Sequence, residues 1–244
     1  MNKRTTEEAV FPRAGRKTAM VIGGGRGIGR ETALELARRG YEIILAARTK
    51  REIESACASI RELGTSAWPI ALDITSAPEL QVSFETIRSK TDRLHLLVNS
   101  AGSIFPGGLI ETSPEAFQSM MAVNLMGVYS SIYYARDLLE CAQGQVINII
   151  SRAGRMPYTK VLAYGCAKSG LVYLTRALSQ ELSRYGIRVN AVSPGAVATE
   201  LRKQIFPDED SSRLMAPQAV AAIICKLTEP EFSAVTGGVI DVPW

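Results

Sequence analysis

The chain has 244 residues, of which 46% are hydrophobic and 21% charged, and its formal net charge is +4. This apolar content is too high for a disordered chain, and the glycines and prolines follow no collagen-like period. No run of about 18 apolar residues is free of charged or turn residues, so a membrane span is not expected, and a single α/β domain is the leading prediction.

The N-terminal segment is basic. Residues 1–50 carry 11 Lys/Arg and 5 Asp/Glu, a net charge of +6, which leaves −2 for residues 51–244. We expect residues 1–17 to form a flexible basic leader and residues 18–244 to form one domain. No basic stripe with interleaved aromatic residues is visible, so no nucleic-acid or membrane partner is predicted. Solvated helix faces and an anionic ligand near the start of the domain are both compatible with the excess charge.

From residue 18 onward, short apolar segments alternate with longer helical patterns. The predicted strands are 18–22, 41–46, 67–72, 94–98, 145–150, 187–192 and 238–242. Helical patterns fill the intervals, at 28–39, 50–63, 78–90, 114–139 and 162–185. Apolar strands separated by helices predict βαβ units and a mostly parallel, doubly wound sheet of about seven strands covered by helices on both faces. In such sheets ligands bind beyond the carboxyl ends of the strands.

A glycine-rich turn follows the first predicted strand and leads into the first predicted helix. Glycines permit a tight turn and close approach of the backbone to a pyrophosphate at the helix N-terminus. A purely structural turn is the alternative, and the position between strand and helix argues against it. The residues of this turn expected to bind a dinucleotide are Gly23, Gly25, Arg26, Gly27, Ile28 and Gly29.

The second predicted strand is followed by Ala47, Arg48 and Thr49. A site selective for NAD would place a carboxylate here to bind the adenosine ribose. Arg48 and Arg26, with no acid nearby, instead suit a ribose 2′-phosphate. The alternative is that Arg48 is only a solvated residue at a strand end. We interpret the pattern as a preference for NADP(H) over NAD(H).

The sequence resembles the short-chain dehydrogenase/reductase family, in its compact single-domain branch, over roughly residues 17–241. The resemblance depends on several motifs in order: the glycine turn, Asp73, the segment 99–102, Asn124, Ser151, the segment 164–168 and Pro194-Gly195. It implies a three-layer Rossmann-like fold and an oxidoreductase that interconverts a ketone or aldehyde and an alcohol by hydride transfer.

The resemblance assigns four catalytic residues, Asn124, Ser151, Tyr164 and Lys168. Tyr164 and Lys168 are four residues apart in a predicted helix and therefore share one face. Family members use the tyrosine as the acid/base, with Ser151 polarising the substrate oxygen and Asn124 holding a water in a relay to the lysine. A phenol pKa of about 10 is high for a base, so we expect Lys168 and the oxidised nicotinamide to lower it.

The resemblance also implies further cofactor contacts. Lys168 is expected to bind the nicotinamide ribose beside Tyr164. The other expected contacts are Asp73 and Ile74 at the adenine, Asn99, Ala101 and Gly102 along the cleft, and Pro194, Gly195, Val197 and Thr199 around the nicotinamide. Asp73 has an alternative role at a helix N-terminus.

Cysteine and histidine usage predicts no metal site. Cys57, Cys141, Cys166 and Cys225 lie far apart without metal-binding spacing, and we interpret them as reduced, packed thiols of a cytoplasmic protein. The only histidine, His95, precedes an apolar run and is expected to be structural. Zinc chemistry and Ser-His-Asp catalysis both need imidazole, so neither is expected.

The sequence departs from the family pattern at Ile22, Ser100, the short segment 200–215 and the chain end. We expect the short lid segment to be mobile. One subgroup of the family reduces 3-oxoacyl chains on acyl carrier protein. This remains an alternative, because Arg152, Arg155 and Arg184 could replace the basic cluster that residues 138–143 lack. A non-catalytic dinucleotide-binding sensor or scaffold is the second alternative. Long helices with surplus apolar faces predict a homodimer or homotetramer.

Overall fold

The computed structural model describes residues 15–242, so most of the predicted leader lies outside the described residues. Seven strands form one sheet in the order β3-β2-β1-β4-β5-β6-β7, and every neighbouring pair is parallel. The strands are β1 Thr18–Ile22, β2 Glu42–Ala47, β3 Ala67–Ala71, β4 Leu96–Asn99, β5 Gln145–Ile149, β6 Arg188–Pro194 and β7 Val239–Val242. The prediction of about seven mostly parallel strands is confirmed.

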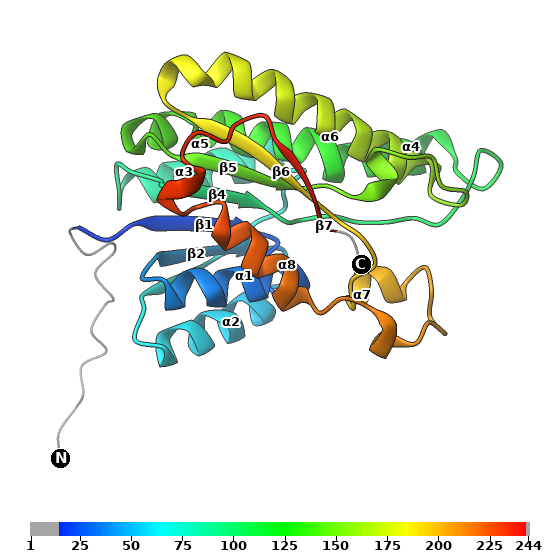
Figure 1. Ribbon diagram of the computed structural model, residues 1–244, viewed down its shortest axis with the longest axis horizontal. Helices are drawn as coiled ribbons and strands as arrows, with labels where there is room; N and C mark the ends of the chain where they lie inside the picture. The colour runs from blue at the N-terminus through cyan, green and yellow to red at the C-terminus, as the bar shows by residue number, and fades with distance from the viewer. Residues whose placement is uncertain (1–14, 243–244) are drawn as a thin grey trace.

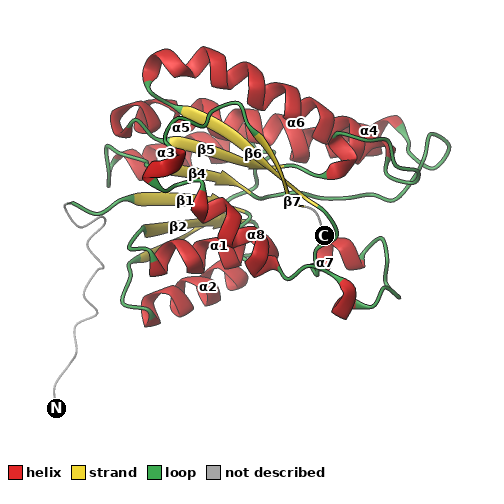
Figure 2. Cartoon of the chain, viewed as in Figure 1, coloured by secondary structure: helices red, strands yellow, loops and turns green. Residues whose placement is uncertain are grey.

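Helices cover both faces of the sheet, which gives three layers (Figures 1 and 2). On one face lie α1 Gly27–Arg38, α2 Lys50–Glu62 and α8 Pro217–Lys226. The opposite face carries α3 Ala77–Arg88, α4 Pro114–Met121, α5 Gly127–Ala142 and α6 Leu162–Glu181, while the short α7 Glu200–Lys203 lies beyond the strand ends. Within residues 15–242 no helix is both long and apolar enough to cross a membrane.

The apolar segments of the sequence form strands whose two sides are both buried. In β1, Ala19 and Val21 pack into the core beneath α1, whereas Met20 and Ile22 pack into the core beneath α3 and α5. Alternate side chains of a strand point to opposite faces, so each face of the sheet needs its own apolar layer. This explains why the strands are continuous apolar runs instead of alternating patterns.

The structure divides the helix expected at 114–139. Between α4 and α5 lies a five-residue π-helical segment, η1 Ala122–Met126, and α5 continues to Ala142. A π segment of this kind is commonly a single-turn bulge at a functional position, and this one carries Asn124. The helical pattern in the sequence gave no sign of the interruption.

The prediction that all four cysteines are packed is wrong for two of them. Cys57 and Cys225 are buried, but Cys141 and Cys166 are exposed. Burial raises the pKa of the Cys57 thiol to about 11 and that of Cys225 to about 12, so both remain protonated near neutrality. His95 lies just before β4, and its Nδ1 accepts a hydrogen bond from the Thr18 amide at 3.0 Å, which is a structural role.

A buried chain of polar side chains braces the central strands. Asn99 donates to Asn148 Oδ1 at 3.0 Å, and Asn148 donates to Thr175 Oγ1 on α6 at 3.0 Å. Ser131 of α5 donates to Asn99 Oδ1 at 2.8 Å. Each buried amide therefore has partners, and the chain fixes α5 and α6 against β4 and β5.

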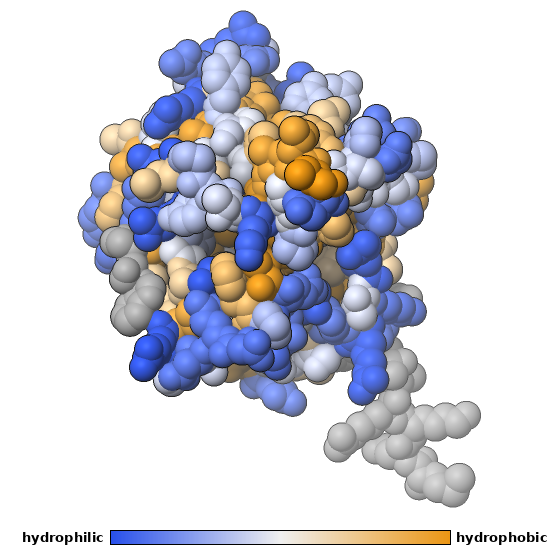
Figure 3. Space-filling view, turned by 90° about the vertical axis from the view of Figure 1, so that its right-hand side faces the viewer, coloured by the Kyte–Doolittle hydropathy of each residue, from blue (hydrophilic) through white to orange (hydrophobic). Residues whose placement is uncertain are grey.

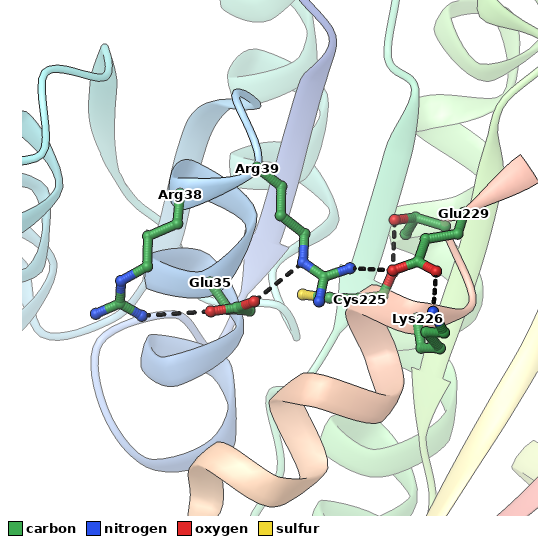
Figure 4. A network of polar contacts seen from close by, with 7 residues as sticks. Glu35, Arg38, Arg39, Cys225, Lys226 and Glu229 are labelled. Carbon is green, nitrogen blue, oxygen red and sulfur yellow. Dashed lines mark hydrogen bonds and ion pairs between the residues drawn. The ribbon is translucent and has the colours of Figure 1, made fainter.

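An ion network joins the end of α1 to the end of α8 (Figure 4). Arg39 donates to Glu35 Oε1 at 3.0 Å and to Glu229 Oε1 at 2.7 Å, and Glu229 also pairs with Lys226. Arg38 contacts the other oxygen of Glu35 at 3.4 Å. The network thus holds α1, the helix that follows the glycine turn, against α8.

Candidate active site

A cavity of about 880 Å³ opens along the edge where the parallel strands end. The strand order places β1 beside both β2 and β4, so the connection after β1 runs to β2 on one side, whereas the chain after β4 continues to β5 on the other side. Such a switch point forms a crevice between the loops. Figure 3 faces this edge, where a group of apolar side chains lies among hydrophilic neighbours.

The glycine turn after β1 forms one end of the cavity. Gly23 has a φ of +83°, and a Cβ there would overlap the backbone of Ala101. A Cβ at Gly29 would overlap the carbonyl oxygen of Gly23. No side chain of the described residues caps the N-terminus of α1, so its first amides are left for another acceptor.

The prediction that no acid lies near Arg26 is wrong. Glu52, in the first turn of α2, lines the same cavity, and its Oε1 lies 3.9 Å from Arg26 Nη1. A Cβ built on Gly25 would lie 3.0 Å from Glu52 Oε2, so this carboxylate lies against the glycine turn. Thr49 and Glu52 have the spacing of a capping box, which predicts a helix start but not the approach of Glu52 to the glycine turn, and the Thr49 side chain makes no cap hydrogen bond.

Arg48 also has an acidic neighbour. It is exposed at the end of β2 and lines the cavity close to Asp73, which follows β3. Burial acts to raise the pKa of Asp73, but hydrogen bonds from Thr75 and the charge of Arg48 together lower it. Asp73 Oδ1 accepts from the Thr75 amide at 2.9 Å, whereas the N-cap of α3 is Ser76. Asp73 is therefore an anion in the cavity wall.

Ser151 and Tyr164 lie beside each other in the cavity wall. Ser151 follows β5, and its Oγ accepts a hydrogen bond from the Ala153 amide at 3.2 Å. Tyr164 stands in the first turn of α6 and is buried. Burial raises the pKa of Tyr164 to about 12, and a side-chain hydrogen bond with Ser151 opposes this. The pKa of the phenol is therefore above its ordinary value, and the lowering expected from Lys168 does not outweigh burial; the lowering expected from the oxidised nicotinamide stays a prediction.

Lys168 lies one turn further along α6, on the same face. Its Nζ donates to the Ile149 carbonyl of β5 at 2.8 Å and lies 5.7 Å from the centre of the Tyr164 ring. Burial lowers the pKa of Lys168 to about 8. A Cβ at Gly102 would lie 3.9 Å from Lys168 Nζ and 3.1 Å from Asn124 Oδ1, so these two side chains flank one glycine.

Asn124 is fully buried in the π segment and fixes the loop after β4. Its Nδ2 donates to the Ser103 carbonyl at 2.9 Å and to the Met120 carbonyl at 3.1 Å. Its Oδ1 accepts from the Ser103 amide at 3.4 Å. The side chain is thus committed to backbone partners, while its neighbour Val123 lines the cavity.

The structure brings most of the predicted site residues to one cavity. Those in its wall are Gly23, Gly25, Arg26, Gly27, Ile28, Arg48, Thr49, Asp73, Ile74, Ala101, Gly102, Ser151, Tyr164, Lys168, Pro194, Gly195, Val197 and Thr199. Gly29, Asn99 and Asn124 do not line it. Asn99 differs from expectation because its side chain belongs to the buried bracing chain between strands.

Sequence reasoning missed most of the wall beyond Ser151 and Tyr164. Its apolar side chains come from three loops and include Ile104, Pro106, Tyr158, Val161, Ile205 and Phe206. Arg152 and Lys160 lie in the same part of the wall. No pattern in the sequence marks the apolar residues or Lys160, because the loops that hold them have no regular period. Arg152 is expected from the sequence only as one of the basic residues that could contact an acyl carrier protein.

The short lid segment is held together by its own contacts. Arg202 of α7 donates to both carboxylate oxygens of Glu209, at 2.6 and 2.7 Å. The Arg202 guanidinium also stacks 4.4 Å from the centre of the Phe206 ring. Beyond these, the Ala198 amide donates to the Met215 carbonyl at 2.9 Å. These contacts give the segment a defined arrangement, and its mobility stays a prediction.

Comparisons with known proteins agree with this geometry. Residues 17–210 match the family described as "short chain dehydrogenase". The chain is 34% identical to the human 3-oxoacyl-[acyl-carrier-protein] reductase over 78% of this chain and 79% of the relative. It is 32% identical to the short-chain reductase protein NovJ of Streptomyces niveus over 98% and 95% of the two chains. A crystal structure of a variant actinorhodin polyketide ketoreductase with NADPH superimposes with a TM-score of 0.86 at 27% identity, covering 93% of this chain and 96% of that one.

Proposed function

We propose that this chain, which belongs to the short-chain dehydrogenase family and is therefore an oxidoreductase acting on alcohol and carbonyl groups, reduces a ketone or aldehyde with NADPH. The observation that carries the proposal is the convergence of Ser151, Tyr164 and Lys168 on one cavity whose other end is a glycine turn at a helix N-terminus.

The residues present fit a dinucleotide. The glycine turn leaves space that a Cβ would fill, and the uncapped α1 offers amides to a pyrophosphate. Ala101 and Gly102 would line the middle of the cofactor, and Pro194, Gly195 and Thr199 would surround its nicotinamide. The bound nicotinamide would supply the hydride.

Tyr164 would donate the proton to the carbonyl oxygen. With a pKa of about 12 the phenol is protonated at neutral pH, which suits reduction more than oxidation. Ser151 lies beside it and would donate a hydrogen bond to the same oxygen as negative charge develops there. One acid and one hydrogen-bond donor are thus directed at one substrate atom.

Lys168 would act as the electrostatic partner of Tyr164 and bind the nicotinamide ribose. Its position one helical turn away lets its positive charge favour the phenolate that remains after proton transfer. The Asn124 side chain holds the backbone of Ser103 against the π segment. This arrangement would shape the path by which a proton from solvent returns to Lys168.

Arg26 and Arg48 support a preference for NADP(H). Both line the cavity beyond β1 and β2, where the adenosine ribose would lie, and guanidiniums bind phosphate strongly. Glu52 and Asp73 weaken this charge, so we propose a moderate preference. We further propose a cytoplasmic homodimer or homotetramer that acts on a small carbonyl substrate.

Nucleotide titration followed by turnover tests the proposal. We expect NADPH to bind about tenfold or more tightly than NADH, measured by nicotinamide fluorescence. We expect Tyr164→Phe to lower kcat about 100-fold or more, because general acid catalysis contributes that much, while the Kd for NADPH changes little.

The control is Tyr185→Phe, which removes a phenol hydroxyl that lies outside the cavity wall. Full turnover by the Tyr164 variant with a range of ketones would contradict the mechanism. Tight NADPH binding without turnover of any carbonyl compound would instead favour the sensor or scaffold.

A further inference from the structure

The cations of the cavity wall fall into two groups. Arg26 pairs with Glu52, Arg48 lies close to Asp73, Lys168 donates to the Ile149 carbonyl, and Arg202 is bound by Glu209. The remaining two are Arg152 and Lys160. Within residues 15–242 neither has an ion pair or a side-chain hydrogen bond, although each is a long cationic side chain that could reach an anion.

These two cations lie at the substrate end of the cavity. Arg152 directly follows Ser151, and Lys160 comes four residues before Tyr164. The phosphate-binding turn follows β1, and β4 lies between β1 and β5, so the two strand ends are about 10 Å apart. Arg152 and Lys160 are therefore on the side of the reacting groups and not among the residues that fit the pyrophosphate.

The backbone at Lys160 is held in an unfavourable conformation. Lys160 has a φ of +65°, which is uncommon for a residue other than glycine. Its carbonyl accepts from the Gly107 amide at 2.7 Å, and the Gly107 carbonyl accepts from the Leu162 amide at 3.1 Å. This bridge fixes the loop on both sides of Lys160. Strain of this kind at a cavity points to a functional requirement on the residue.

The rest of this end of the wall is mostly apolar. Ile104, Pro106, Tyr158, Val161 and Phe206 surround the space beyond Ser151. Glu200 of α7 is the acid in this part of the wall, and it forms no ion pair with Arg152 or Lys160 among the described residues. Arg152, Lys160 and Glu200 together carry a net positive charge, and this charge lies beside an apolar surface.

We propose that Arg152 and Lys160 form an anion subsite, so that the preferred carbonyl substrate has an apolar body and carries a carboxylate or phosphate. This inference rests on the proposed reductase function. The anion binds Arg152 and Lys160, the apolar body packs on Tyr158 and Phe206, and the carbonyl oxygen faces Tyr164. A carboxylate and a phosphate both carry the negative charge that the subsite would bind. The experiment below distinguishes carboxylate substrates from phosphate substrates.

Matched ketones test the subsite. Aryl methyl ketones with a para carboxylate on zero to three methylenes are compared with their methyl esters and with phosphate monoesters of equal length, using NADPH. We expect an acid to exceed its ester in kcat/KM about tenfold, which corresponds to one charge-assisted contact. A higher value for phosphate esters than for carboxylates identifies phosphorylated substrates; the reverse identifies free acids.

Charge-neutral variants assign the effect to residues. We expect Arg152→Gln and Lys160→Gln each to reduce the acid-to-ester ratio about threefold and the double variant to bring it near one, with ester turnover unchanged. Lys203→Gln is the matched control, because Lys203 is an exposed cation of α7 outside the cavity wall. Lys160→Asn provides a second variant, since asparagine tolerates a positive φ.

The outcomes separate the two proposals. Equal turnover of acids and esters, or a double variant that keeps the acid preference, overturns the anion subsite and leaves the reductase function intact. Failure to reduce any member of the series, together with failure to bind NADPH, overturns the reductase function itself.

Discussion

Glu52 stands where a bound nucleotide would meet the positive charge of Arg26. Its carboxylate lies 3.9 Å from Arg26 and against the glycine turn, so it opposes an added phosphate in two ways. It competes for the guanidinium, and it repels the phosphate directly. The proposed preference for NADP(H) would therefore depend on a balance of charges and not on the arginines alone.

We expect Glu52→Gln to raise the preference for NADPH. The ratio of the Kd for NADH to the Kd for NADPH should increase about fivefold, which is the size of a partly screened interaction between charges several ångströms apart. Nicotinamide fluorescence at two salt concentrations measures it. Glu54→Gln is the control, because Glu54 is exposed on the same helix and pairs with Lys50. An unchanged ratio would show that Glu52 does not act on the nucleotide.

The buried Lys168 makes the free energy of unfolding depend on pH. Burial lowers its pKa to about 8 from an ordinary 10.5. Between these two values the unfolded chain holds a proton that the folded protein lacks, so the contribution of Lys168 to stability rises with pH across this window. Below pH 8 both states are charged and the cost of burying the charge is present in full.

We therefore expect the free energy of unfolding of Lys168→Met to exceed that of the wild type by the largest margin below pH 8. The margin should shrink by about 3 kcal/mol between pH 8 and 10.5, from the size of the pKa difference. Urea unfolding of both proteins at several pH values tests this, and activity should be lost in the variant throughout. A margin independent of pH would mean that Lys168 keeps its ordinary pKa.

Single residues differ in how far the sequence could predict them. Ser151, Tyr164 and Lys168 could be placed because one follows a strand end and the other two share a helical face. Glu52 and Lys160 could not, because only tertiary packing brings α2 against the glycine turn and the loop before α6 against Gly107.

At the scale of elements, strand positions follow from apolar runs to within a few residues, because burial on both faces needs such runs. The π segment between α4 and α5 does not follow from them. It is stabilised by contacts from outside the helix, since Asn124 binds the backbone of Ser103 as well as that of Met120. Hydrophobic periodicity indicates which face of a helix is buried, but it does not indicate where α-helical hydrogen bonds change to π-helical ones.

The two long helices on one face of the sheet also expose aromatic side chains. Tyr133 of α5 is 64% exposed and Tyr173 of α6 is 76% exposed, and Tyr129 stacks on Tyr133. Large exposed aromatic groups on neighbouring elements are typical of surfaces that are covered in an assembly. This face is the one on which a second copy of the chain would pack in the homodimer or homotetramer proposed above.

For the whole molecule, we expect Tyr133→Lys combined with Tyr173→Lys to convert the proposed oligomer to a monomer. Two buried charges without partners would destabilise the interface far more than they would the fold. Light scattering after gel filtration measures the mass. Leu63→Lys is the control, since Leu63 is an exposed apolar residue at the end of α2, on the opposite face of the sheet. If the double variant keeps its mass, the interface lies elsewhere.

The three-layer architecture could be predicted because alternating strands and helices allow few arrangements. The positions of β6 and β7, and the packing of α8 on α1, could not, because they depend on contacts between distant parts of the chain. The same holds for the substrate end of the cavity, whose loops are fixed by contacts such as the bridge between Gly107 and Val161.

The ion pair between Arg39 and Glu229 joins residues 190 positions apart. Its consequence appears during synthesis on the ribosome, where the chain emerges from its N-terminus. The glycine turn and α1 are made early, yet the side of α1 that packs on α8 stays uncovered until α8 and Glu229 have emerged. The nascent protein therefore completes the packing around α1 only when translation is nearly finished, and a prematurely terminated chain exposes the side of α1 that α8 would cover.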